Sequence, residues 1–267
     1  MNVSRFIWLL GCLLAACAAS PDLKAPTHSM RASEKAAIGQ KIWQNECGGR
    51  VDGLTAWNVG EEFPSLGIGH FIWYPAGVQG RFEESWPSFI AYAIEQGANP
   101  PAIARRRPCP WPSREAFLGS FEGPELRGVR AWLAANVALQ TDFIIARYRA
   151  AVPAVIAAAP ASERERISAN HRKLMASPQG VYAAIDYVNF KGEGIRQSER
   201  YQGRGWGLLQ VLGEMKDVPA GAPAAAEFAA AAKRVLSRRI ANSPPARGES
   251  RWESGWHRRC DTYAAPL

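Results

Sequence analysis

Apolar residues recur at helical spacing over residues 33–47, where Ile38 and Ile42 lie four positions apart. Ser33 precedes this stretch as a typical cap residue, and two glycines at positions 48–49 follow it as a typical stop. The periodicity therefore predicts an amphipathic helix over 33–47 that turns its isoleucines toward the core.

Glu46 lies four positions after Ile42, so a 3.6-residue period places it on the same buried stripe. Loss of water and the negative end of the helix dipole both disfavour a carboxylate there, which raises the pKa expected for the group. Such a carboxyl group can hold a proton near neutral pH, as a general acid must. The alternative is a side chain that turns to solvent at a frayed helix end.

The rest of the chain changes from a β-rich stretch to helices. Residues 51–77 are dense in glycine, aromatic and β-branched residues, which predicts a hairpin or small sheet. Helical spacing then recurs over 86–97, 113–121, 124–159, 160–176 and 224–243. A second glycine-rich stretch covers 189–212, and the tail 244–267 is basic and predicted to be irregular. The pattern predicts an α+β fold, mostly helical, with residues 33–267 forming one domain.

The composition and net charge limit the classes of partner that the protein is expected to bind. The 267 residues are 47% hydrophobic and 21% charged, as in an ordinary globular protein. The formal charge of +8 favours an anionic partner such as nucleic acid, anionic lipid or bacterial cell wall. Ten tryptophans and seven tyrosines offer flat faces that stack on sugars or bases, although most such rings fill cores.

The N-terminus points to export. Residues 1–16 have the charged start, short apolar run and small residues of a signal peptide. The last of them, with Cys17, form Leu-Ala-Ala-Cys, which resembles the lipobox of bacterial lipoproteins and implies cleavage before a lipidated Cys17. Residues 17–32 then form a flexible tether. Cys12 is a second candidate for lipidation, and ordinary secretion with cleavage near Ala19 is the competing interpretation.

Export also argues against a nucleic-acid partner. Arg105–Arg107 and Arg238–Arg239 are basic runs that could neutralise phosphates. The chain shows no recognition-helix, zinc-finger or RRM motif to accompany them. Ala18, after the predicted lipidated cysteine, would permit sorting to the outer membrane of a double-membrane bacterium. We therefore expect a periplasmic protein anchored to that membrane by lipid alone, of unknown oligomeric state.

Three further cysteines, Cys47, Cys109 and Cys260, would lie in an oxidising compartment. Cys109 and Cys260 occupy segments that look exposed, so a disulfide between them is a candidate tie for the tail. Their spacing predicts no metal site. Cys47 is expected as a small buried residue beside Glu46, or as a nucleophile if one of the histidines lies near it.

The order of Glu46 and the later segment Ser65-Leu66-Gly67-Ile68-Gly69-His70 resembles the phage-type lysozymes of the lysozyme-like superfamily. The family carries a catalytic Glu at the end of its first helix and a T-x-G-x-G-H hairpin strand. The resemblance implies that Glu46 is the acid, that Ser65 helps hold the attacking water, and that Gly67, Gly69 and His70 line the sugar. Strand glycines let a polysaccharide lie close to the backbone. We expect His70 to be a structural hydrogen-bonding group, with a role as base as the alternative.

A second segment, Tyr201 to Gln210, is similar to the G-[RL]-[GM]-Q segments of lytic transglycosylases and family 19 chitinases. In those relatives it forms a wall opposite the acid, so the similarity implies that Tyr201, Trp206 and Gln210 bind substrate. The alternative is a glycine turn that leads into a helix.

The second carboxylate of the family has no match at the family's spacing. Glu62, then Glu61, then Asp52 are the candidates because they lie between Glu46 and the glycine segment. Glu193 and Glu199 flank the second glycine-rich stretch and are further candidates, although loop carboxylates are usually solvated. The candidate sugar platforms are Trp57, Trp73, Tyr74 and Trp206.

The sequence thus predicts a secreted enzyme that cleaves the glycan strands of peptidoglycan, without metal or cofactor. Glu46 would act as general acid, with Glu62 and Ser65 handling the water. A lytic transglycosylase is the alternative if no second carboxylate reaches the site, because a lone Glu can act as acid and then base. From another class, a non-catalytic lipoprotein that binds the cell wall would keep the fold but not the chemistry.

Overall fold

The computed structural model describes residues 30–80 and 82–267. This part of the chain is mostly helical, with a small antiparallel sheet directly after the first helix, so the predicted α+β class is confirmed. None of the helices in the described ranges is both long enough and apolar enough to span a membrane.

Ten α-helices account for most of the described residues. They are α1 (Ala32–Cys47), α2 (Trp86–Glu95), α3 (Arg114–Gly119), α4 (Pro124–Ala135), α5 (Val137–Ala157), α6 (Arg164–Leu174), α7 (Pro178–Lys191), α8 (Leu208–Glu214), α9 (Ala222–Asn242) and α10 (Glu253–Asp261). Short 3-10 helices occur between them, including η1 (Asp52–Leu54), η2 (Ala102–Arg105), η3 (Gln197–Glu199), η4 (Pro245–Arg247) and η5 (Glu249–Trp252).

The strands are only two residues long. The three-stranded sheet has the order β1 (Thr55–Ala56), β2 (Ser65–Leu66) and β3 (Phe71–Ile72), and the separate hairpin pairs β4 (Arg200–Tyr201) with β5 (Arg204–Gly205). In the central strand Ser65 lies opposite both Ala56 and Ile72. The predicted sheet over 51–77 is therefore present, but its connecting turns hold more residues than its strands do.

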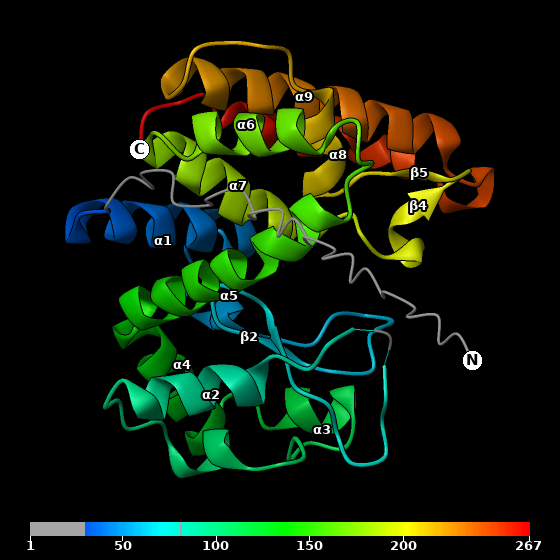
Figure 1. The fold of residues 1–267 in the computed structure, drawn as a ribbon. Helices are drawn as coiled ribbons and strands as arrows, with labels where there is room; N and C mark the ends of the chain where they lie inside the picture. Colours follow the sequence, from blue (N-terminus) through cyan, green and yellow to red (C-terminus); the bar gives the residue numbers. More distant parts are fainter. Residues whose placement is uncertain (1–29, 81) are drawn as a thin grey trace, which may run out of the picture.

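Two groups of elements lie on either side of α5 (Figure 1). The sheet-side half, residues 50–135, contains the three-stranded sheet and α2 to α4. The helical half, residues 160–263, contains α6 to α10 and the β4–β5 hairpin. The long helix α5 contacts elements of both halves, and α1 packs against α5 and α7.

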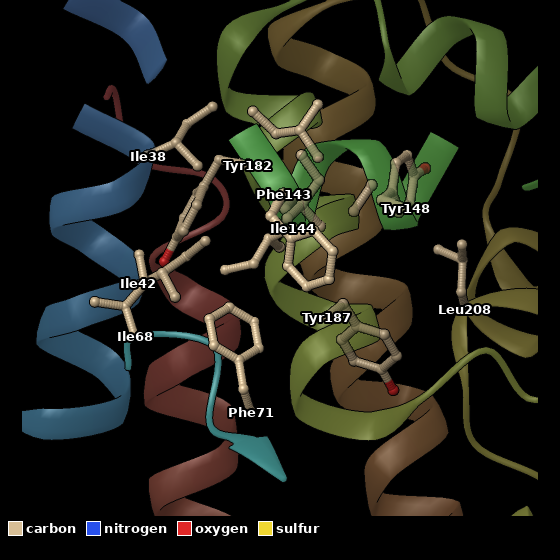
Figure 2. Close-up of a cluster of buried hydrophobic side chains, with 14 of the residues drawn as sticks. Ile38, Ile42, Ile68, Phe71, Phe143, Ile144, Tyr148, Tyr182, Tyr187 and Leu208 are labelled. Carbon is tan, nitrogen blue, oxygen red and sulfur yellow. The ribbon is translucent and has the colours of Figure 1, made fainter. Parts of the chain in front are cut away.

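The core between these elements is apolar and aromatic. Figure 2 shows Ile38 and Ile42 of α1 directed toward the α5 side chains Phe143 and Ile144, with Phe71 of β3 below them. Both isoleucines are fully buried, as their spacing predicts. Burial of such side chains contributes roughly 1.5–3 kcal/mol each, so this contact holds the end of α1 in place.

Several predicted boundaries are wrong. Ser33 is not the cap of α1: the helix begins one residue earlier, and the Arg31 backbone N–H donates to Glu34 Oε2 at 2.8 Å. The predicted helix 124–159 is two helices that meet at Asn136. The tail 244–267 is not irregular, because it contains η4, η5 and α10. Its polar sequence has little apolar periodicity, and the helix forms by packing on α9.

Candidate active site

Glu46 lies in the last turn of α1, and its side chain keeps only 12% of its surface exposed. Arg259 of α10 donates through Nη2 to Glu46 Oε1, and Asn189 Nδ2 of α7 donates to the same oxygen at 3.1 Å. The other oxygen, Oε2, lies 3.5 Å from His70 Nδ1. Three segments far apart in the sequence therefore surround one carboxylate, which is largely but not fully buried on the face where its spacing places it.

Arg259 also contacts a second carboxylate, Asp186 of α7. Its Nε and Nη2 donate to the two oxygens of Asp186 at 2.8 and 2.9 Å. Asp186 is 0% exposed and also accepts from Tyr263 Oη at 2.7 Å and from Asn45 Nδ2 at 3.3 Å. Burial acts to lower the pKa of Arg259, but the contacts with Asp186 and Glu46 outweigh it and raise that pKa, so the guanidinium stays charged.

Three residues of this cluster, Arg259, Asp186 and Asn189, were not predicted from the sequence. Asp186 and Asn189 lie three positions apart on one face of α7, a helix that the periodicity analysis leaves unassigned. Arg259 lies in the tail predicted to be irregular. The sequence does contain a helix-start pattern that could have located α7. Ser177 Oγ accepts from the Gly180 backbone N–H, and Pro178 follows at the first helical position.

His70 lies in the turn between β2 and β3, and its φ of 47° is in the left-handed region. The turn aims the imidazole at the end of α1, where Nε2 is 3.8 Å from Cys47 Sγ and Nδ1 faces Glu46. Burial, followed by the charges of Glu46 and Asp52, raises the pKa of Cys47 to about 12. The thiol therefore keeps its proton at neutral pH, which argues against Cys47 as a nucleophile although a histidine is beside it.

The glycines of this segment do not line an open surface, in contrast to the prediction. They form the turn rather than a strand, and residues 66–69 are buried. Gly67 has a φ of 73°, and a Cβ there would lie 2.3 Å from Gln140 Oε1 of α5. A Cβ on Gly69 would lie 2.5 Å from the Phe71 ring. Both glycines are required by close packing within the protein, not by a sugar.

The predicted water-handling residues do not contact Glu46 by a hydrogen bond or ion pair in the described residues. Ser65 is buried in the central strand, and Glu62 is exposed. Glu61 accepts from Asn58 Nδ2 at 3.1 Å at the surface. Asp52 pairs with Arg50, and its charge acts on Cys47. Of the three predicted second acids, Asp52 is therefore the one near Cys47, the residue that follows Glu46.

The two loop carboxylates differ from each other. Glu199 Oε2 accepts from the backbone N–H groups of Gly194 and Arg196 at 2.8 and 3.1 Å, so it shapes its own loop. Burial raises the pKa of Glu193, and the nearby charges of Arg196 and Glu199 act on it in opposite directions. Glu193 therefore remains a carboxyl group that holds its proton more readily than an exposed glutamate.

Most of the predicted sugar platforms belong to the core. Trp57, Trp73, Tyr74 and Trp206 are all buried. Trp73 stacks on Trp86 with ring centres 5.4 Å apart, for example. These rings stabilise the fold and do not offer a flat face to a ligand.

The segment 201–210 is likewise structural. Gln210 Nε2 donates to the Gly194 carbonyl at 3.0 Å, while its Oε1 accepts from the Gly207 backbone N–H at 2.9 Å. Gln210 therefore joins two glycine loops, and both ends of its amide group are already hydrogen-bonded within the protein. Tyr201 Oη donates to Glu249 Oε1 at 2.8 Å, and the Tyr201 ring packs on Trp206. The alternative, a glycine turn leading into helix α8, is what the structure contains.

The predicted disulfide is absent, since Cys109 and Cys260 are both free and buried. The Cys109 backbone N–H donates to the Tyr74 carbonyl in the sheet-side half, whereas Cys260 lies in α10 of the helical half. Burial raises the pKa of both thiols to about 12. Cys17, the predicted lipidation site, and the alternative Cys12 lie outside the described residues.

We compared the chain with protein-family models, with curated proteins and with solved structures, and none of the three comparisons gives a match.

Proposed function

We propose that this protein is a glycoside hydrolase that cleaves the glycan strands of peptidoglycan, with Glu46 as the general acid. The supporting observation is the enclosed carboxylate at the end of α1, held by Arg259 and Asn189 on one oxygen and facing His70 with the other. A general acid needs a fixed orientation and shielding from water, and Glu46 has both.

The contacts determine which oxygen of Glu46 carries the proton. Oε1 accepts two N–H groups, from Arg259 and Asn189, so both of its lone pairs are occupied. A proton on Glu46 therefore resides on Oε2, the oxygen on the His70 side. The departing glycosidic oxygen would approach from that side, within about 3 Å of Oε2, for the proton to be transferred.

The charges of Glu46, Asp186 and Arg259 also suit a proposed mechanism in which the Glu46 carboxyl group gives up a proton and takes it back. Asp186 and Glu46 share the single guanidinium of Arg259, and Asp186 is the more deeply buried and more fully hydrogen-bonded of the two. When Glu46 is protonated, one carboxylate and one guanidinium remain in balance. When it is ionised, Arg259 and Asn189 stabilise the charge, as the second half of an acid–base cycle requires.

A lytic transglycosylase acting on the same bond is the second candidate. It is favoured by the position of Ser65 and Glu62, which make no hydrogen bond or ion pair with Glu46 in the described structure. Without a second carboxylate, the 6-hydroxyl of the sugar can attack while Glu46 acts as acid and then base. Asp52 is the residue that would activate water in the hydrolytic route.

The test is digestion of purified sacculi with the wild-type protein and with Glu46→Gln, followed by mass spectrometry of the released muropeptides. The amide keeps the shape of the side chain but does not transfer an acidic proton, so we expect the rate to fall by ~10²–10⁴. Glu95→Gln, at the exposed end of α2, is the matched control and should digest at the wild-type rate.

The products separate the two enzymatic routes. Reducing ends would show hydrolysis, whereas 1,6-anhydro ends would show transglycosylation. In the hydrolytic case Asp52→Asn should also lose activity. Wild-type protein that binds sacculi but releases no muropeptide would instead indicate a cell-wall-binding protein, and a fall of less than about tenfold in Glu46→Gln would refute the assigned acid.

A further inference from the structure

Lys191, the last residue of α7, carries an amine that has no acidic partner. Its Nζ lies 3.3 Å from the centre of the Trp256 ring and 4.0 Å from the centre of the Phe190 ring. Within residues 30–80 and 82–267, no oxygen lies within hydrogen-bonding distance of this Nζ. The amine therefore packs on aromatic faces and makes no hydrogen bond or ion pair within the described residues, so an anionic partner could still bind it.

The charged groups around Lys191 leave it uncompensated. Arg239 of α9 and Arg259 of α10 act against its positive charge, and Glu249 acts in its favour. Glu249, however, is already bonded to Arg239 at 2.8 Å and to Arg247 at 3.1 Å. Burial, followed by the two arginines, lowers the pKa of Lys191 to about 6. Within the described ranges, Lys191 therefore has no carboxylate of its own, because Glu249 is shared by the two arginines.

Two indole rings lie next to this amine, and one of them is exposed. Trp252 is 39% exposed, and its ring centre is 5.8 Å from that of the partly buried Trp256. Trp252, Trp256 and Arg259 are spaced four and three residues apart, so they lie along one face of α10 and the turn before it. At 1.5 Å per residue, Trp252 is about 10 Å along the helix axis from Arg259.

The row of side chains formed by Trp252, Trp256 and Arg259 begins beside Glu46, the candidate acid. Arg259 contacts Glu46, and both Arg259 Cζ and Lys191 Nζ pack on the Phe190 ring, at 4.2 and 4.0 Å from its centre. A saccharide chain with one unit at Glu46 could therefore reach Trp256 and Trp252 with the units that follow. Flat aromatic faces that are open to solvent suit the apolar face of a sugar ring.

We propose that Lys191, Trp252 and Trp256 form a subsite for a saccharide that carries a carboxylate group. The sugar stacks on the exposed ring of Trp252, and its carboxylate pairs with the amine of Lys191, which lies over the neighbouring Trp256 ring. The inference rests on the proposed glycan-cleaving function and names its substrate class: glycan strands from which the peptides have been removed, whose lactyl carboxylates are free.

Binding at this subsite is coupled to proton uptake. A carboxylate beside Lys191 favours the charged amine and raises its pKa above the value of about 6 in the free protein. Affinity is then highest when the amine is already protonated, at pH 6 and below, and falls as the pH rises above 6. Of the facing groups, Arg259 and Glu249 keep their charges over this range, because their ion pairs raise the pKa of the guanidinium and lower that of the carboxyl group to about 2. Arg239, the third facing group, is paired with Glu249.

The experiment measures binding by calorimetry at pH 6 and pH 8 with two tetrasaccharides of equal length. One alternates N-acetylglucosamine with peptide-free N-acetylmuramic acid, and the other, made of N-acetylglucosamine alone, has no carboxylate. At pH 6, wild-type protein should bind the acidic saccharide at least about tenfold more tightly than the neutral one, a difference of about 1.4 kcal/mol in binding free energy. Part of that preference should be lost at pH 8.

Lys191→Met keeps the length of the side chain and its contact with Trp256 but removes the amine. It should lose both the preference for the acidic saccharide and its pH dependence while binding the neutral saccharide as the wild type does. Lys216→Met, on the exposed loop before α9, removes the same charge elsewhere and should change neither. Trp252→Ala should weaken the binding of both saccharides.

Three results would overturn the proposal: equal binding of the two saccharides by the wild type, an undiminished preference in Lys191→Met, or no saturable binding of either. The assay needs no bond cleavage, so it separates this proposal from the catalytic one. A protein that shows the Lys191-dependent preference but does not digest sacculi would keep the subsite and lose the assigned enzymatic activity.

Discussion

Arg259 illustrates how one side chain organises charge at the residue scale. It is mostly buried and contacts Glu46 and Asp186 at once, so neither carboxylate is left without a partner. Burying a single unpaired charge costs several kcal/mol, whereas a shared and hydrogen-bonded cluster offsets that cost. The cluster therefore fixes the orientation of Glu46, whose side chain keeps 12% of its surface exposed.

Lys191, unlike Arg259, has no carboxylate partner among the described residues, and its contribution to the free energy of unfolding depends on pH. Its pKa is about 6 in the folded protein against the ordinary value of 10.5, so between these pH values the unfolded chain binds more protons than the folded one. Stability therefore rises with pH across this window and is lowest where the amine is protonated in both states.

We predict that Lys191→Met removes this pH dependence. The free energy of unfolding of the wild type, measured by urea denaturation, should rise relative to that of the variant between pH 6 and 9, with a slope of at most about 1.4 kcal/mol per pH unit. Lys216→Met, on an exposed loop, should track the wild type. Parallel stability curves for wild type and Lys191→Met would show that the amine is solvated.

At the scale of elements, the turn between β2 and β3 depends on one buried amide. Gln140 of α5 is 0% exposed, and its Oε1 accepts from the Ile68 backbone N–H at 2.9 Å. Its Nε2 donates to the Leu133 carbonyl of α4 at 2.7 Å. The side chain thus ties the turn that carries His70 to two helices of the body.

Gln140→Leu should therefore cost stability and displace His70. The substitution leaves the Ile68 N–H buried without a partner and removes one of the two donors to the Leu133 carbonyl, which keeps the Asn136 N–H. We expect a loss of about 1–3 kcal/mol in the free energy of unfolding. Activity on sacculi should fall as well, because the imidazole would no longer face Glu46. The matched control is Gln96→Leu at the exposed end of α2, expected within about 0.5 kcal/mol of wild type. An unchanged denaturation midpoint for Gln140→Leu would contradict the assigned role.

Element by element, the sequence was informative where a helix has a clear apolar stripe. The spacing of Ile38 and Ile42 predicted α1 and the burial of Glu46, because both follow from the 3.6-residue period alone. The same method did not identify α7 or α10. In α7 nearly every residue from Val181 to Tyr187 is buried, so no alternation of polar and apolar positions marks it. The helix α10 is mostly polar and forms against α9.

At the scale of the whole molecule, α5 joins the two halves into one structure. Phe143 packs on Phe71 and Phe89 of the sheet-side half, with ring centres 5.4 and 5.5 Å away. One turn later, Tyr148 Oη lies 2.8 Å from His171 Nε2 of α6 in the helical half. Burial lowers the pKa of His171 to about 4, so this contact stays neutral at physiological pH.

We predict that the two halves unfold together and that Phe143→Ala lowers the stability of both. Loss of the buried ring should reduce the free energy of unfolding by about 3–5 kcal/mol. Helical circular dichroism reports on both halves, whereas tryptophan fluorescence is weighted toward the sheet-side half, which holds Trp57, Trp73, Trp86, Trp111 and Trp132. The two transitions should coincide in wild type and variant, and a fluorescence transition that precedes the dichroism transition would show independent units.

The sequence by itself determined the class of fold, the first helix and the place of Glu46 on its buried face, because these depend on periodicity over a few neighbouring residues. Tertiary structure alone decided which groups surround that carboxylate. Asn189, Arg259 and His70 reach Glu46 from positions 143, 213 and 24 residues away along the chain, and only packing brings them there. It also decided that Gly67, Trp73 and Gln210 serve the interior, since residue type alone does not tell a close internal contact from a ligand surface.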